Sequence, residues 1–103
     1  MALHGQTPDK IREAVKELRP FRIGNVSGQT HLGGTGQLPE EYAAMLRVND
    51  RSGMVKYVLY SYSTPVAWLL EGGEWVQPQV RYSASTLGHQ SVFASAIRER
   101  AAA

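Results

Sequence analysis

The stretch MVKYVLYSYSTPVAWLLEGGEWVQP, residues 54–78, decides the fold of this chain. It is rich in β-branched and aromatic residues, which favour strands. Within it, the pair Gly72-Gly73 predicts a two-residue hairpin turn, because both glycines can take the positive φ that such a turn needs. The stretch therefore predicts consecutive antiparallel strands over residues 55–63, 65–71 and 74–80.

Side-chain alternation within this stretch places apolar residues on both faces of the sheet. Tyr57 and Leu59 point to one face, whereas Val58, Tyr60 and Tyr62 point to the other. An interior strand that is covered on both sides is therefore expected.

The Gly72-Gly73 turn also predicts how the two strands that it joins are paired. The expected cross-strand pairs are Leu70 with Trp75, Leu69 with Val76, and Trp68 with Gln77. In this register Trp68 and Trp75 share one face of the sheet, because side chains two residues apart on a strand point the same way.

The flanking sequence predicts helices at both ends of the chain. Near the N-terminus, Pro8 suits the first turn of a helix, and Pro20 ends that helix. Near the C-terminus, Ser85 or Thr86 is a natural N-cap. The predicted elements outside residues 54–78 are a helix over 7–19, a strand over 21–28, a Gly-rich loop over 29–37, a short helix over 39–47, a strand or cap over 81–86 and a helix over 87–100.

Together these elements predict an α+β fold in a single domain of residues 1–103. We expect an antiparallel sheet of about four strands with the N-terminal and C-terminal helices on one face, plus a short middle helix. The chain has no cysteine, so disulfides and thiolate metal sites are excluded. His4, His31 and His89 are scattered along the sequence, so no metal site and no cofactor are predicted.

Charge and hydropathy restrict the partners and the cellular location that we expect for the protein. The net charge is +2 and the pI is about 9.2, which permits a polyanionic partner without requiring one. No apolar run is long enough for a signal peptide or a membrane span, so we expect a cytoplasmic protein. The segment GQTHLGGT, residues 28–35, has the outline of a P-loop, but Gly34 replaces the required lysine, which excludes P-loop hydrolysis.

Two clusters of hydroxyl-bearing residues mark the candidate site, at residues 60–68 and 81–90. His89 falls in the first turn of the last predicted helix, on its core-facing side. A neutral imidazole has one donor and one acceptor, so His89 suits either a structural latch that ties this helix to the sheet or a general base. We expect Thr64, Ser83 and His89 to lie close together. The full candidate cluster is Tyr60, Tyr62, Thr64, Trp68, Tyr82, Ser83, Thr86 and His89.

These motifs resemble a group of small uncharacterised proteins from actinobacterial phages and their hosts. The resemblance is carried by YVLYSYSTPVAW, by GEWVQP and by YSASTLGHQ, and it covers about residues 21–97. It implies a phage or mobile-element setting and supplies no mechanism. Leu87-Gly88 replaces the Ser-Arg or Ser-Lys pair that is usual in this group, which removes a cation from the start of the last helix.

The preferred expectation is a small non-catalytic accessory protein that binds nucleic acid or a host protein. Aromatic residues on a sheet can stack on bases, which favours nucleic acid. An exposed patch of Trp68, Trp75 and Tyr62 would instead anchor a host protein. Self-association through an unpaired sheet edge is also open, and no membrane partner is expected.

The alternative is a Ser/His-dependent hydrolase or nuclease. Ser83 or Ser61 would be the nucleophile and His89 the base, with Asp50 or Glu71 orienting the ring. No G-x-S-x-G elbow surrounds either serine, so this alternative ranks below a binding function.

Overall fold

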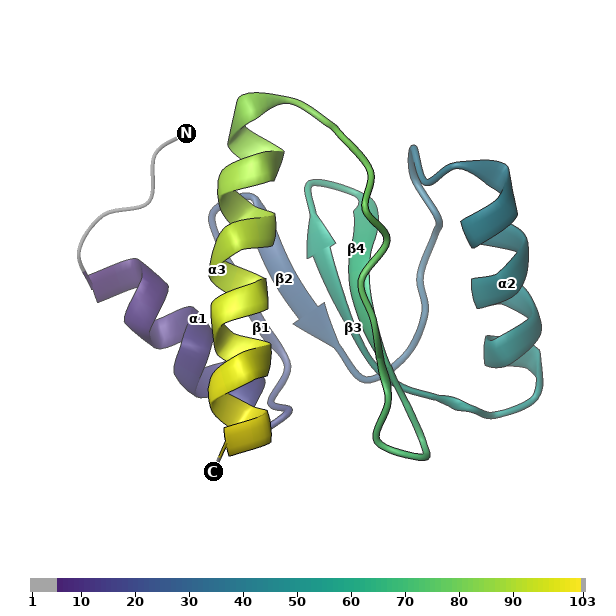
Figure 1. The fold of residues 1–103 in the computed structure, drawn as a ribbon, viewed down its shortest axis with the longest axis horizontal. Coiled ribbons are helices and arrows are strands. Elements are labelled where there is room, and N and C mark those ends of the chain that lie inside the picture. Colours follow the sequence, from purple (N-terminus) through teal and green to yellow (C-terminus); the bar gives the residue numbers. More distant parts are fainter. Residues whose placement is uncertain (1–5, 103) are drawn as a thin grey trace.

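The computed structural model of the protein describes residues 6–102. Its elements in chain order are α1 (Gln6–Lys16), β1 (Phe21–Ile23), β2 (Val26–Gln29), α2 (Glu40–Arg51), β3 (Val55–Ser61), β4 (Thr64–Leu70), β5 (Trp75–Val76) and α3 (Ala84–Ala102). The strands form one antiparallel sheet in the order β1-β2-β3-β4-β5, and α1 and α3 lie together on one side of it while α2 lies on the other (Figure 1). The predicted α+β class is confirmed, with five strands in place of about four.

The sheet separates two hydrophobic clusters. The cluster under α1 and α3 contains Ile11, Val15, Tyr57, Leu59, Leu69, Phe93, Ala96 and Ile97. The cluster under α2 contains Leu38, Ala43, Leu46, Val58, Tyr60 and Trp68. The predicted alternation along β3 is therefore confirmed for four residues: Tyr57 and Leu59 face one cluster, and Val58 and Tyr60 face the other. The same prediction is wrong for Tyr62, which lies beyond the end of β3 and contacts His89 of α3.

The single strand predicted over residues 21–28 is wrong, because two strands occupy this segment. Ile23 pairs with Val26, so Gly24 and Asn25 form a two-residue hairpin loop. Gly24 has a φ of 59°, the left-handed conformation that glycine adopts without steric penalty. The Gly-Asn pair is itself a hairpin signal in the sequence.

The register predicted for the β4–β5 hairpin is also wrong, by one residue. Trp68 pairs with Val76 and Leu69 with Trp75. Gly73 alone of the two loop glycines has a positive φ, of 95°, and its N–H donates to the Leu70 carbonyl. This is the pattern of a three-residue loop with a bulge rather than a two-residue turn. As a result, Trp68 and Trp75 lie on opposite faces of the sheet.

The helices differ in length from their predictions. α1 ends at Lys16 rather than at residue 19, because Leu18 has a φ of 54° and the Arg19 N–H donates back to the Ala14 carbonyl. Such bonds close a helix in the Schellman motif. α2 runs to Arg51, one turn beyond residue 47, since no proline or glycine interrupts it before that point.

The last helix begins earlier than predicted, at Ala84. Its cap is Ser83, whose Oγ accepts from the Thr86 N–H at 3.3 Å, and not Ser85 or Thr86. The strand predicted over 74–80 is reduced to Trp75–Val76, and residues 77–83 cross to α3 as an irregular segment, which we call the strap. Within residues 6–102, no helix combines the length and the apolar character needed to cross a bilayer.

Candidate functional site

A hydrogen-bonded chain of side chains joins the two hydroxyl-bearing segments. The Ser61 Oγ at the end of β3 lies 2.7 Å from the His89 Nδ1 and donates to the Thr86 Oγ1 at 3.0 Å. The Ser83 Oγ in turn donates to the Thr86 Oγ1 at 3.3 Å. We call Ser61, Ser83, Thr86 and His89 the hydroxyl network. It ties the first turns of α3 to the sheet, as expected for His89, but Ser61 rather than Thr64 is the partner from the first segment.

His89 is enclosed within this network. Its side chain is 2% exposed, and the Tyr62 ring lies over it at a centroid distance of 5.8 Å. Burial lowers the pKa of His89, because a charged imidazolium loses its hydration inside the protein. The ring is therefore neutral at pH 7, and its one donor and one acceptor match a hydroxyl partner. This geometry is that of the predicted latch.

The lowered pKa of His89 predicts a loss of stability in acid. Unfolded His89 has an ordinary pKa of about 6.5, so below that pH the unfolded chain binds a proton that the folded chain resists. The free energy of unfolding should therefore fall as the pH drops below about 6.5, by at most about 1.4 kcal/mol per pH unit. Urea unfolding between pH 7.5 and 5 measures this slope. In His89→Asn this component of the slope should be absent; an unchanged slope would contradict the assignment.

Tyr60 and Thr64, two further members of the predicted cluster, hold the Gly-rich loop instead. The Gly33 N–H donates to the Tyr60 hydroxyl at 2.8 Å, and the Gln37 N–H donates to the Thr64 Oγ1 at 2.9 Å. Both side chains are almost fully buried. They therefore fix the loop over β3 and β4, and among the described residues no hydrogen bond joins either hydroxyl to the hydroxyl network.

The two remaining members are Trp68, which lies apart from the others, and Tyr82, which lines a cleft together with Tyr62, Thr64, Ser83 and Thr86. Trp68 is 0% exposed in the core under α2, so the predicted anchor patch of Trp68, Trp75 and Tyr62 does not form. Tyr82 packs its ring against the core under α1 and α3. Its hydroxyl is buried and has no hydrogen-bond partner among the described residues.

The geometry gives little support to a Ser/His hydrolase. Ser61 contacts His89, but its side chain is 1% exposed and offers a substrate almost no access. Asp50 lies on α2 across the sheet, and Glu71 lies in the β4–β5 hairpin, at the opposite end of β3 from Ser61. Neither of these two carboxylates is therefore placed to orient the His89 ring. Residues 6–102 also contain no cluster of three His, Asp or Glu side chains that could bind a metal; His4 lies outside the described residues.

Two neighbouring clefts flank the tip of the β3–β4 hairpin. The larger has a volume of about 520 Å³ and is lined by residues 36, 37, 61–64, 81–83 and 86. The smaller, of about 220 Å³, is lined by residues 22, 24–27, 62 and 63. Tyr62 and Ser63 belong to both. We call the lining of the two clefts the hairpin-end surface.

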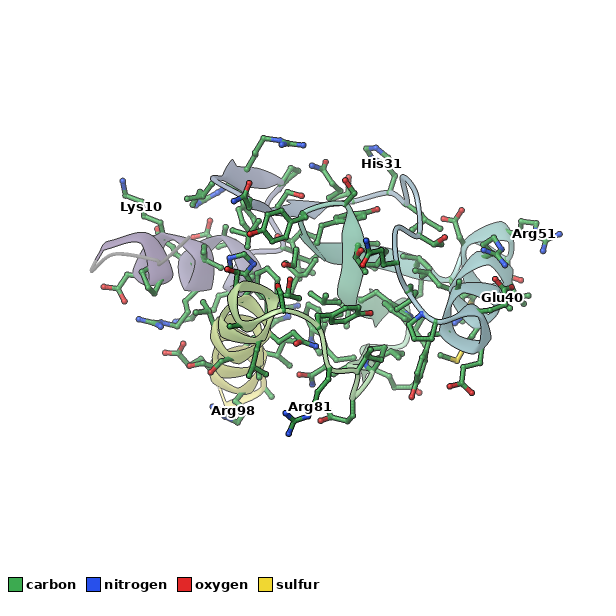
Figure 2. All side chains as sticks on the ribbon, turned by 90° about the horizontal axis from the view of Figure 1, so that it is seen from above. Lys10, His31, Glu40, Arg51, Arg81 and Arg98 are labelled. Carbon is green, nitrogen blue, oxygen red and sulfur yellow. The ribbon has the colours of Figure 1, made fainter. Side chains whose placement is uncertain are left out.

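The hairpin-end surface carries positive charge only. Arg22 lines the smaller cleft and Arg81 the larger, and neither cleft is lined by an aspartate or glutamate. Neither arginine forms an ion pair with a described residue. Figure 2 shows Arg81 extended outward, apart from the charges of Glu40 and Arg51 on α2. No motif in the sequence marks these two arginines, because Arg22 lies in β1 and Arg81 in the strap, almost sixty residues further along the chain.

Tyr62 is strained at the centre of this surface. Ser61 pairs with Thr64, so Tyr62 and Ser63 form a two-residue loop like that of Gly24 and Asn25. Tyr62 has a φ of 56°, almost the same as Gly24, although a bulky side chain rarely adopts this conformation. Its side chain is nevertheless 49% exposed. Strain of this kind gathers at functional sites, so Tyr62 is the residue that the geometry singles out.

Comparison with family models identifies a family for most of the chain. The model of a family of unknown function (DUF8033) matches residues 19–101, which leaves only α1 and the chain ends outside. Neither the curated proteins nor the solved structures contain a match to this chain.

Proposed function

This chain belongs to that family of unknown function (DUF8033), and we propose that it is a non-catalytic protein that binds single-stranded nucleic acid at the hairpin-end surface. The observation that carries the proposal is Tyr62, a half-exposed ring in a strained backbone conformation between two clefts that carry only positive charge.

An exposed tyrosine offers a planar surface on which an unpaired base can stack. Stacking on an aromatic side chain contributes about 1–3 kcal/mol per base and tolerates any base, because every base has a π-face. In a duplex the bases are already stacked and paired, so the Tyr62 ring has no comparable partner there. The exposed ring therefore favours a single strand over a duplex.

The two arginines suit the phosphates on either side of a stacked base. Arg22 and Arg81 line different clefts, and Tyr62 lines both. A strand that crosses Tyr62 would thus pass from one guanidinium to the other. Polar groups without charge, such as Asn25, Gln37 and Ser63, line the same clefts and can bind sugar or base edges.

Binding to a labelled single-stranded oligonucleotide of about 12 nucleotides is expected to weaken with salt. Two phosphate contacts predict a slope of about −1.4 in log K against log salt, which is about a sevenfold loss of affinity between 50 and 200 mM salt. Fluorescence anisotropy measures both. A duplex of the same length should bind more weakly; equal or tighter duplex binding would contradict the stacking role of Tyr62.

Variants separate the stacking and charge contributions in the same titration. Tyr62→Gly should lower the affinity by about tenfold or more. The variant should still fold, because the relief of strain at the positive φ offsets the lost ring contact with His89. Arg22→Gln or Arg81→Gln should each reduce the salt slope by about 0.7. Arg51→Gln on α2 removes the same charge and should change nothing. Full affinity in Tyr62→Gly would reject the proposal.

The biological setting is part of the proposal. We place the protein in the bacterial cytoplasm, as an accessory protein of a phage or mobile element, on the basis of the motif resemblance and of the nucleic-acid partner. A host protein remains the second partner class proposed from the sequence. The host-protein proposal loses its main support because Trp68, part of the expected anchor patch, is buried. A pull-down that recovers host protein but no nucleic acid would rank the host protein above nucleic acid as the partner.

A further inference from the structure

The outer face of α2 is uncovered. Figure 1 shows α2 alone on its side of the sheet, with no other helix or strand of the described chain beyond it. Five large apolar side chains are exposed among the described residues, and three of them, Met45, Val48 and Met54, lie on α2 or just after it. Exposed apolar side chains that gather on one element are typical of an interaction surface.

The residues at the centre of this face are arranged symmetrically along the helix. They are exposed and follow one another at intervals of three, four and three positions, which is the spacing of one helix face: Glu41, Ala44, Val48 and Arg51. We call these four residues the α2 stripe. Glu41 and Arg51 lie five residues before and after position 46, and Ala44 and Val48 lie two residues before and after it.

The two charged residues of the α2 stripe have no opposite charge to pair with among the described residues. Neither Glu41 nor Arg51 forms an ion pair there, whereas Arg47 beside the stripe pairs with Glu40. Figure 2 shows Arg51 pointing away from the rest of the molecule. The stripe therefore presents an acidic end, an apolar centre and a basic end to a partner.

From the symmetry of the α2 stripe we infer that its partner is a second copy of this chain, bound with the two α2 helices antiparallel. A two-fold axis level with position 46 places Glu41 of each copy beside Arg51 of the other. The same axis sets Val48 of each copy against Ala44 of the other, so a large side chain meets a small one where the helices pack. Parallel helices would instead place like charges together at both ends, which is unfavourable.

The contact is short, so the dimer is weak. α2 has 12 residues, which corresponds to about 18 Å of helix. A contact of this length falls below the area of about 1,200 Å² at which stable interfaces begin, and we expect a dissociation constant of about 100 μM. The α2 stripe shares no residue with the hairpin-end surface, so dimerisation and nucleic-acid binding can succeed or fail separately.

Sedimentation equilibrium of the full chain, from about 10 μM to about 1 mM, measures the dissociation constant. Glu41→Arg and Arg51→Glu each bring like charges together at both ends of the dimer, and each should weaken it by about tenfold or more. In an equimolar mixture of these two variants, both contacts again join opposite charges. A heterodimer should therefore form with close to the affinity of the unmodified chain.

A variant at the apolar centre gives an independent test. Val48→Lys places a charge on each side of the two-fold axis and should abolish dimerisation. Leu87→Lys, the matched control at an equally exposed side chain of α3, should dimerise as the unmodified chain does. All four positions are exposed, so the variants should fold, which circular dichroism checks. A chain that stays monomeric at about 1 mM, a dimer that persists in Val48→Lys, or two charge variants that do not associate when mixed would overturn the inference.

Discussion

Replacement of Trp68 by alanine is expected to lower the free energy of unfolding by about 3–5 kcal/mol. Trp68 is 0% exposed and lies in the core under α2, with Val58 opposite it on β3. Truncation removes a large buried surface and leaves a cavity that the sheet and α2 cannot close without moving. Equilibrium unfolding in urea measures the change, and a loss of this size takes a large share of the stability of a small domain.

Two further variants test whether Trp68 is a core residue and not an exposed binding anchor. Trp68→Phe should lose much less than Trp68→Ala, because it retains a ring and the Trp68 Nε1 has no hydrogen-bond partner among the described residues. Leu87→Ala, at an exposed apolar side chain, should change stability by no more than about 0.5 kcal/mol. If Trp68→Ala were as mild as Leu87→Ala, the side chain would not be packed under α2.

Replacement of His89 by alanine is expected to lower the free energy of unfolding by about 2–4 kcal/mol. His89 is 2% exposed, and its loss leaves the Ser61 Oγ without its 2.7 Å partner as well as a cavity beneath α3. Because the hydroxyl network joins α3 to β3, the damage should concentrate at the first turns of α3. Hydrogen exchange of the amides of residues 84–90 would locate it there.

Two variants provide the comparison for His89→Ala. His89→Asn keeps a polar atom near the position of Nδ1 and should recover part of the loss. His31→Ala removes an exposed histidine from the Gly-rich loop and should change stability by no more than about 0.5 kcal/mol. A stable His89→Ala protein that no longer binds oligonucleotide would assign His89 to the binding surface and not to a latch.

The sequence determined the features that depend on local periodicity. Alternation within residues 54–78 predicted that Tyr57 and Val58 face opposite cores, and the proline and N-cap signals near the two chain ends predicted helices where α1 and α3 lie. His89 was predicted in the first turn of the last helix and toward the core, and its contact with Ser61 agrees with this. Such patterns are readable because one buried face imposes a fixed period on the side chains.

Only the tertiary structure decided which residues from distant segments meet. The β4–β5 register depends on the φ of Gly73, which the twist of the paired strands selects from several conformations open to glycine. The burial of Trp68 depends on where α2 packs, and the two arginines of the hairpin-end surface come from segments almost sixty residues apart. Neither the hydrophobic period nor the residue type predicts which distant segments meet, because long-range packing decides this. The strain at Tyr62 likewise follows from tertiary structure. Because Ser61 pairs with Thr64, Tyr62 lies in a two-residue loop and takes a positive φ, which tyrosine does not favour.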